Sequence, residues 1–113
     1  MSEDLKINSK SFKQWMKYNF NKDELGDMIN HGVDGGFHGM IYYADLDKLF
    51  MKFKDELIDM LDDTADEQGY NGFMDMFVQN GTAKKIRSYN MFISYVVWCC
   101  AELIAYEMIE ESD

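Results

Sequence analysis

The sequence predicts an all-α fold, a compact single domain over residues 1–113 with about five helices. Apolar residues recur at three- and four-residue spacing through most of the chain, which is the spacing of one helix face. There is no proline anywhere to break a helix. Glycines and capping residues gather at a few places and divide the chain into segments of helical length. A hydrophobic content of 47% is enough for one packed core.

Two helices are predicted before residue 32. Ser9 or Ser11 can cap the first, because a serine oxygen accepts a hydrogen bond from a free backbone N–H. This helix carries the apolar residues Phe12, Trp15, Met16 and Phe20. Asn21 with Glu24 three residues later forms a capping box for the second helix, which should end near His31-Gly32.

A glycine-rich loop, NHGVDGGFHGMIYYAD, spans residues 30–45, and Ile41 and the two tyrosines after it could form one short strand pair. Glycines permit positive φ in such a loop, and Asp34 and Asp45 can bond backbone amides, Asp45 as a helix N-cap. The alternative is a ligand site. Its candidate residues are His31, Asp34, His38, Tyr42, Tyr43 and Asp45. Because their spacing matches no metal or phosphate motif, no metal and no cofactor are expected.

A long helix should open at Ala44 or Asp45 and run to Gly69. Its apolar residues keep helical spacing: Leu46, Leu49, Phe50, Phe53, Leu57, Leu61 and Ala65. A brief helix over residues 71–79 should stop at Asn80-Gly81. Thr82 then caps a last helix that runs almost to the C-terminus.

The last helix is predicted to be the most buried element, because it is apolar on every side. One stripe contains Ile86, Tyr89, Ile93, Val96, Val97, Cys100, Leu103 and Ile104, and Phe92, Tyr95 and Trp98 lie on the other face. The run 92–98 is also rich in strand-forming residues, and residues 91–109 approach the length of a membrane span. Glu102 and Glu107 interrupt that span, so a core helix is the simpler interpretation. Two adjacent cysteines and the lack of a secretory start favour the cytoplasm.

The acidic residues are concentrated in the middle of the chain. The net charge is −10, of which residues 41–80 carry −7. Residues 55–67 contain seven carboxylates and no base: Asp55, Glu56, Asp59, Asp62, Asp63, Asp66 and Glu67. The five aspartates share one helix face, opposite Leu57 and Leu61. Such an excess of negative charge disfavours nucleic acid and anionic lipid as direct partners and favours a basic protein surface.

Two interpretations of this acidic helix are open. The carboxylates recur about every 5–6 Å along the helix, a row of anions comparable in reach to a nucleic-acid backbone. They could therefore mimic nucleic-acid charge and occupy a basic groove. The other interpretation is a solvated face that keeps the protein in solution. The basic residues Lys84, Lys85 and Arg87 could neutralise the acidic helix or contact RNA.

One motif carries a resemblance to a known group of proteins. It consists of Asn30-His31-Gly32-x-Asp34-x-Gly36-Phe37-x-Gly39-x-Ile41-Tyr42-Tyr43-x-Asp45. With the helix after it, this run resembles small uncharacterised proteins encoded by tailed phages. The resemblance implies a phage context and transfers no functional residue. Small acidic phage proteins are similar, as a class, to anti-defence factors such as anti-CRISPR proteins.

The leading hypothesis is therefore a non-enzymatic, phage-encoded inhibitor of a host defence nuclease complex, acting in the host cytoplasm. No catalytic residue is assigned. One rival is a small metal-dependent or acid–base enzyme centred on His31, Asp34 and His38. Another is an adaptor or homodimer that uses an adaptable, methionine-rich face, since the chain has ten methionines.

Overall fold

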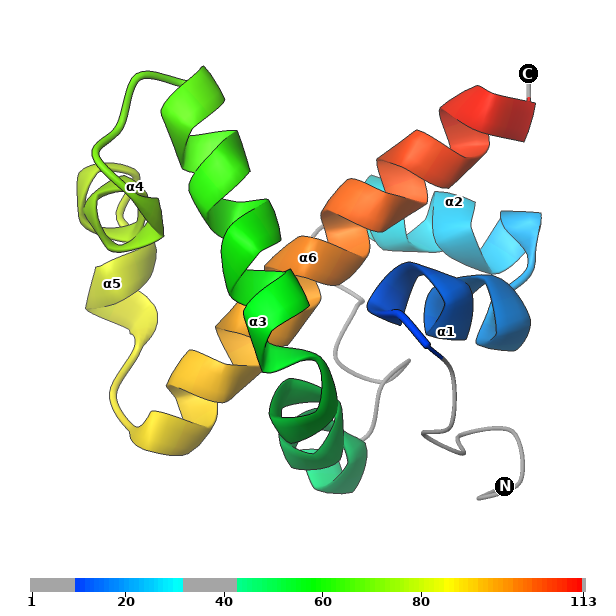
Figure 1. The fold of residues 1–113 in the computed structure, drawn as a ribbon, viewed down its shortest axis with the longest axis horizontal. Helices are drawn as coiled ribbons and strands as arrows, with labels where there is room; N and C mark the ends of the chain where they lie inside the picture. The colour runs from blue at the N-terminus through cyan, green and yellow to red at the C-terminus, as the bar shows by residue number, and fades with distance from the viewer. Residues whose placement is uncertain (1–9, 32–42, 113) are drawn as a thin grey trace.

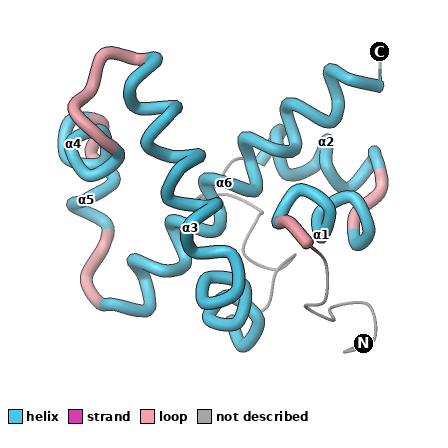
Figure 2. Tube along the Cα trace, in the orientation of Figure 1, coloured by secondary structure: helices cyan, strands magenta, loops and turns pink. Residues whose placement is uncertain are grey.

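Every regular element in the computed structural model is an α-helix within the described residues, which are 10–31 and 43–112. In chain order these are α1 (Phe12–Asn19), α2 (Lys22–His31), α3 (Tyr43–Glu67), α4 (Phe73–Gln79), α5 (Thr82–Lys85) and α6 (Tyr89–Ser112) (Figure 1). Figure 2 shows that short loops join α1 to α2 and α3 through to α6. The all-α prediction is confirmed. The strand pair expected near Ile41 falls outside the described residues.

Helix α6 forms the centre of the fold. It crosses the molecule diagonally, with α3 on one side and α1 and α2 on the other, while α4 and α5 lie beyond α3 (Figure 1). Residues 93–98 are each at most 6% exposed, so every side of this turn-and-a-half is covered. The predicted helix over residues 92–98 is confirmed. Residues 89–111 are long and apolar enough to cross a membrane, but 56% of the most apolar window is buried inside the protein.

Helices α1 and α2 begin as the sequence predicts. The Ser11 hydroxyl accepts a hydrogen bond from the Gln14 backbone N–H at 3.0 Å. Asn21 and Glu24 each accept a hydrogen bond from the backbone N–H of the other at 2.9 Å, which completes the capping box. The apolar residues of α1 all enter the core: Phe12, Trp15, Met16 and Phe20.

Helix α3 starts at Tyr43, one or two residues before the predicted start. Asp45 is therefore inside the helix, and its predicted role as N-cap is wrong. The other end follows the prediction: Gly69 has φ +89°, Tyr70 N–H donates to Ala65 O at 2.8 Å, and Gly69 N–H donates to Asp66 O at 3.1 Å. These two bonds form the glycine-dependent Schellman end of a helix.

Helix α3 is bent. Phe53 leaves helical geometry, with φ −114° and ψ 19°, and the segments on its two sides run in different directions (Figure 1). Both segments nevertheless bury their predicted apolar residues, namely Leu46, Leu49, Phe50, Phe53, Leu57, Leu61 and Ala65. The bend therefore keeps one continuous apolar side against the core.

The prediction of one helix from Thr82 to the C-terminus is wrong, because the chain forms two helices there. Ile86 is extended, with φ −87° and ψ 110°, and it packs against the core. The Ser88 hydroxyl then accepts a hydrogen bond from the Met91 N–H at 3.2 Å, so Ser88 acts as a new cap. Tyr89, predicted to lie in the buried stripe, is 65% exposed.

Candidate functional site

Five carboxylates form what we call the acidic face of α3. They are exposed, and none makes a hydrogen bond or ion pair with another described residue: Asp55, Asp59, Asp63, Asp66 and Glu67. The opposite side of the helix is the core, where Leu57, Leu61 and Ala65 are at most 1% exposed. Core packing thus fixes which way the carboxylates point. At about 1.5 Å per residue, the face is about 18 Å long.

The other two carboxylates of the acidic helix have structural roles. Glu56 Oε1 accepts a hydrogen bond from the Phe12 N–H at 2.8 Å, at the N-terminus of α1. Asp62 Oδ1 accepts one from the Phe73 N–H at 2.9 Å, at the N-terminus of α4. A carboxylate is favourable at both places, because the first N–H groups of a helix have no partner within the helix. Asp62 therefore does not belong to the free acidic face in which the sequence placed it.

Basic residues border the acidic face at one end and leave its length uncovered. Lys10, Lys52 and Lys54 line a hollow next to the start of the face. Lys84 and Arg87 are exposed and form no ion pair with any residue in the described part of the chain, so these two do not neutralise the face. The negative charge therefore remains available to a partner.

A groove of about 360 Å³ is lined by residues of α1, α3 and α6 and adjoins the acidic face. We call it the acidic groove. Its lining consists of Lys13, Glu56, Met60, Asp63, Thr64, Glu67, Leu103, Ile104 and Glu107. The Lys13 ammonium pairs with Glu107 and, at 3.0 Å, with Glu111. These hydrogen bonds, to Glu107 first and then to Glu111, raise the pKa of Lys13 above its ordinary value.

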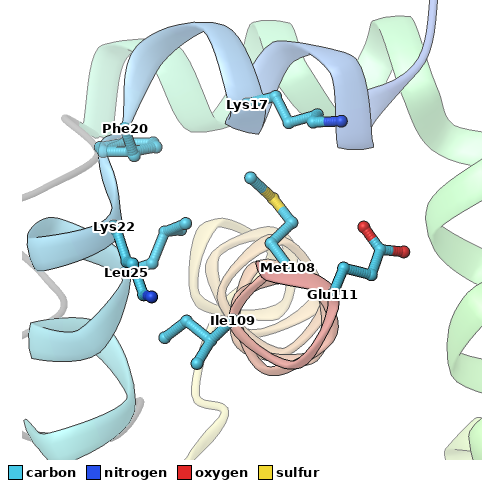
Figure 3. A pocket seen from close by; sticks show the side chains of 7 residues that line it. All are labelled: Lys17, Phe20, Lys22, Leu25, Met108, Ile109 and Glu111. Carbon is cyan, nitrogen blue, oxygen red and sulfur yellow. The ribbon is translucent and has the colours of Figure 1, made fainter. Parts of the chain in front are cut away.

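A second hollow, of about 400 Å³, lies among α1, α2 and the end of α6. Figure 3 shows its apolar side chains, Phe20, Leu25, Met108 and Ile109, with Lys17 and Glu111 on one side and Lys22 on the other. Charges of both signs line this hollow, so its electrostatics select neither an anionic nor a cationic ligand. We assign it no ligand.

Three of the six residues of the predicted loop site lie outside the described residues: Asp34, His38 and Tyr42. His31 is the last residue of α2, and Tyr43 and Asp45 belong to the first turn of α3. Among the residues that the structure describes, no three His, Cys, Asp or Glu side chains are grouped as a metal site would require. The hypothesis of an enzyme centred on this loop stays untested.

Cys100 is not a candidate nucleophile, and the exposed apolar residues in the described part of the chain form no single methionine-rich face. Cys100 is fully buried, its thiol donates to Leu57 O at 3.3 Å, and burial raises its pKa far above the ordinary range, with Cys99 and Glu56 adding to the effect. Such a thiol stays protonated and unreactive. The exposed large apolar residues are scattered over α1, α3, α4 and α6: Tyr18, Met51, Met74, Val78, Tyr89 and Tyr106.

A family model described as a domain of unknown function, DUF7222, matches residues 2–113. No curated protein and no solved structure matches the chain.

Proposed function

Because the chain belongs to the DUF7222 family, whose description names no activity, we propose a function from the surface of the protein itself. The protein is a non-enzymatic inhibitor that presents the acidic face of α3 to the basic, nucleic-acid-binding groove of another protein. In the phage context that the loop motif implies, the partner is a host defence nuclease, and the protein acts as an anti-defence factor of the anti-CRISPR class.

The observation that supports this proposal is the set of five exposed carboxylates on one helix face that have no partner among the described residues. If this face served only to keep the protein in solution, lysines could be interspersed among its carboxylates. The preceding segment of α3 has such lysines, namely Lys48, Lys52 and Lys54. Like charges at i,i+4 cost about 0.2–0.5 kcal/mol per pair. An unrelieved row of carboxylates is therefore a cost to folding that binding to a basic surface would offset.

The spacing of the carboxylates suits a basic groove. Asp55, Asp59, Asp63 and Glu67 recur every four residues, which is about 6 Å along the axis. A groove that binds a nucleic-acid backbone presents lysines and arginines to anions of similar spacing. Association would be steered by long-range attraction and weakened by salt, because the Debye length is only about 8 Å at physiological ionic strength.

The experiment is a pull-down of host proteins with the tagged protein at low and high salt. We expect a nucleic-acid-binding complex to be retained at low salt and released at high salt. The triple variant Asp59→Lys, Asp63→Lys, Asp66→Lys should lose this complex and keep the helical circular dichroism. The matched control reverses three exposed carboxylates away from the acidic face and changes the net charge equally: Asp23 of α2, Asp47 of α3 before the bend, and Glu110 of α6.

Retention of the complex by the control variant, with loss in the acidic-face variant, would support the proposal. Equal loss in both variants would mean that net charge alone is responsible. Undiminished binding by the acidic-face variant would refute charge mimicry through α3.

A further inference from the structure

The acidic groove differs from the acidic face in having an apolar floor. Ile104 is buried, Met60 and Leu103 are partly buried, and all three lie between carboxylates of α3 and α6. Three of the acids that line it are exposed, namely Asp63, Glu67 and Glu107. Its volume, about 360 Å³, is near the lower end of the range of about 300–1,000 Å³ typical of ligand pockets. This size suits one or two side chains of a partner better than a cofactor.

The protein already places one cation of its own in this groove. Lys13 of α1 lies at the α6 side, where its ammonium group binds Glu107 and Glu111. On the α3 side, Asp63 and Glu67 have no cation among the described residues. The α6 side of the groove therefore binds an ammonium group, and the carboxylates on the α3 side have no such cation among the described residues.

We propose that the acidic groove is the anchoring site for a basic amphipathic segment of the partner. A lysine or arginine of that segment would bind Asp63 and Glu67, while its alkyl stem or a neighbouring apolar side chain would cover Met60 and Leu103. The inference rests on the proposed function, since it assumes a basic partner. It adds that the acidic groove, and not the whole acidic face, contributes most of the binding affinity.

The physical reason is that charge and apolar burial act together in the groove. Exposed ion pairs in open solvent contribute little, because water and salt screen them. A cation that lies over an apolar floor loses part of this screening, and the floor itself gains from being covered. Residues that combine both effects in a partly enclosed pocket are typical of binding hot spots.

The test uses two fluorescein-labelled synthetic peptides with the same number of lysines. One forms an amphipathic helix with leucines on its other face, and the second has glutamine in place of each leucine. Binding to the full-length protein is followed by fluorescence anisotropy at low and high salt. Two double variants with equal change in charge are compared: Asp63→Asn with Glu67→Gln in the groove, and Asp55→Asn with Asp66→Asn outside it.

We expect the leucine peptide to bind more tightly than the glutamine peptide. The groove variant should weaken leucine-peptide binding about tenfold, and the variant outside the groove only about twofold through the long-range field. Met60→Gln should remove the preference for leucine, whereas Met51→Gln, an exposed methionine on the same helix, should not. Thermal melts of each variant verify that the fold is intact.

Equal losses in the two double variants would overturn the anchoring groove and leave the acidic face as the binding surface. Equal affinity for the two peptides would show that the apolar floor contributes nothing, and would also overturn it. If neither peptide binds the unmodified protein at low salt, the groove and the proposed function both fail.

Discussion

Asp62 and Asp63 are adjacent aspartates of α3 whose replacement by alanine should change stability in opposite directions. Asp63 is exposed and has three like-charged neighbours at helical spacing, Asp59, Asp66 and Glu67. Removing these three repulsions should stabilise the folded state by about 1 kcal/mol, and the higher helix propensity of alanine should add about 0.5 kcal/mol. Asp63→Ala should therefore raise the free energy of unfolding by about 1.5 kcal/mol.

Asp62→Ala removes the same charge but also the hydrogen bond that Asp62 accepts from the Phe73 N–H. A hydrogen bond to a charged group contributes about 1.5–3 kcal/mol. The variant also loses the repulsion by Asp59 and Asp66 and gains the higher helix propensity of alanine, and together these effects offset about 1 kcal/mol of that loss. The net expectation is a destabilisation of about 1 kcal/mol.

Thermal and urea unfolding, followed by circular dichroism at low salt, measure both changes. At about 4 °C per kcal/mol for a chain of this length, the melting temperature should rise by about 6 °C in Asp63→Ala and fall by about 4 °C in Asp62→Ala. The gain in Asp63→Ala should shrink at high salt, because the repulsion it relieves is screened. If the two variants shift the melting temperature in the same direction, the assignment of one free and one bonded carboxylate is refuted.

Four further predictions concern the core, α1 and the buried thiol. Leu57→Ala should lower the free energy of unfolding by about 3 kcal/mol, measured in urea, because a fully buried side chain is replaced by a cavity; a loss below about 1 kcal/mol would contradict this packing. Lys13→Gln should increase the affinity of the leucine peptide severalfold in anisotropy, because Glu107 and Glu111 become available. The pKa of Lys13 is raised in the folded state above its unfolded-state pKa of 10.5. The stabilisation by Lys13 should therefore be complete below pH 10.5 and disappear at higher pH. Melting temperatures of the parent protein and the Lys13→Gln variant, measured across this range, should converge in alkali. Cys100 should react with iodoacetamide only in denaturant, as mass spectrometry of the labelled peptide can show, since burial raises the pKa of its thiol; labelling in the native protein would contradict this.

The parts of the fold that the sequence predicted depend on neighbouring residues. The caps at Ser11 and at Asn21 with Glu24, and the glycine end of α3 at Gly69, each need only residues a few positions away. The break before α6 was missed because Ile86 leaves the helix in order to pack against the core, and helical spacing continues across it. Tertiary packing there overrides the local pattern.

The site was predicted only in its outline. The acidic face follows from spacing along one helix, so Asp55, Asp59, Asp63, Asp66 and Glu67 could be found from the sequence. The hydrogen bonds that Glu56 and Asp62 accept could not be predicted, because the N–H donors are 44 and 11 residues away. The acidic groove needs side chains of α1, α3 and α6 together, and no linear motif encodes that combination.

The bend at Phe53 and the two bonded carboxylates have a consequence for the entropy of association. The segment of α3 after the bend is fixed to α1 through Glu56, to α4 through Asp62 and to the core through Leu57. Its backbone is thus already ordered before any partner arrives. Immobilising flexible groups on binding costs about 0.5–1.5 kcal/mol per side chain, and this segment would incur that cost only in its short aspartate and glutamate side chains. The acidic face of α3 can therefore bind a partner with little loss of its own conformational entropy.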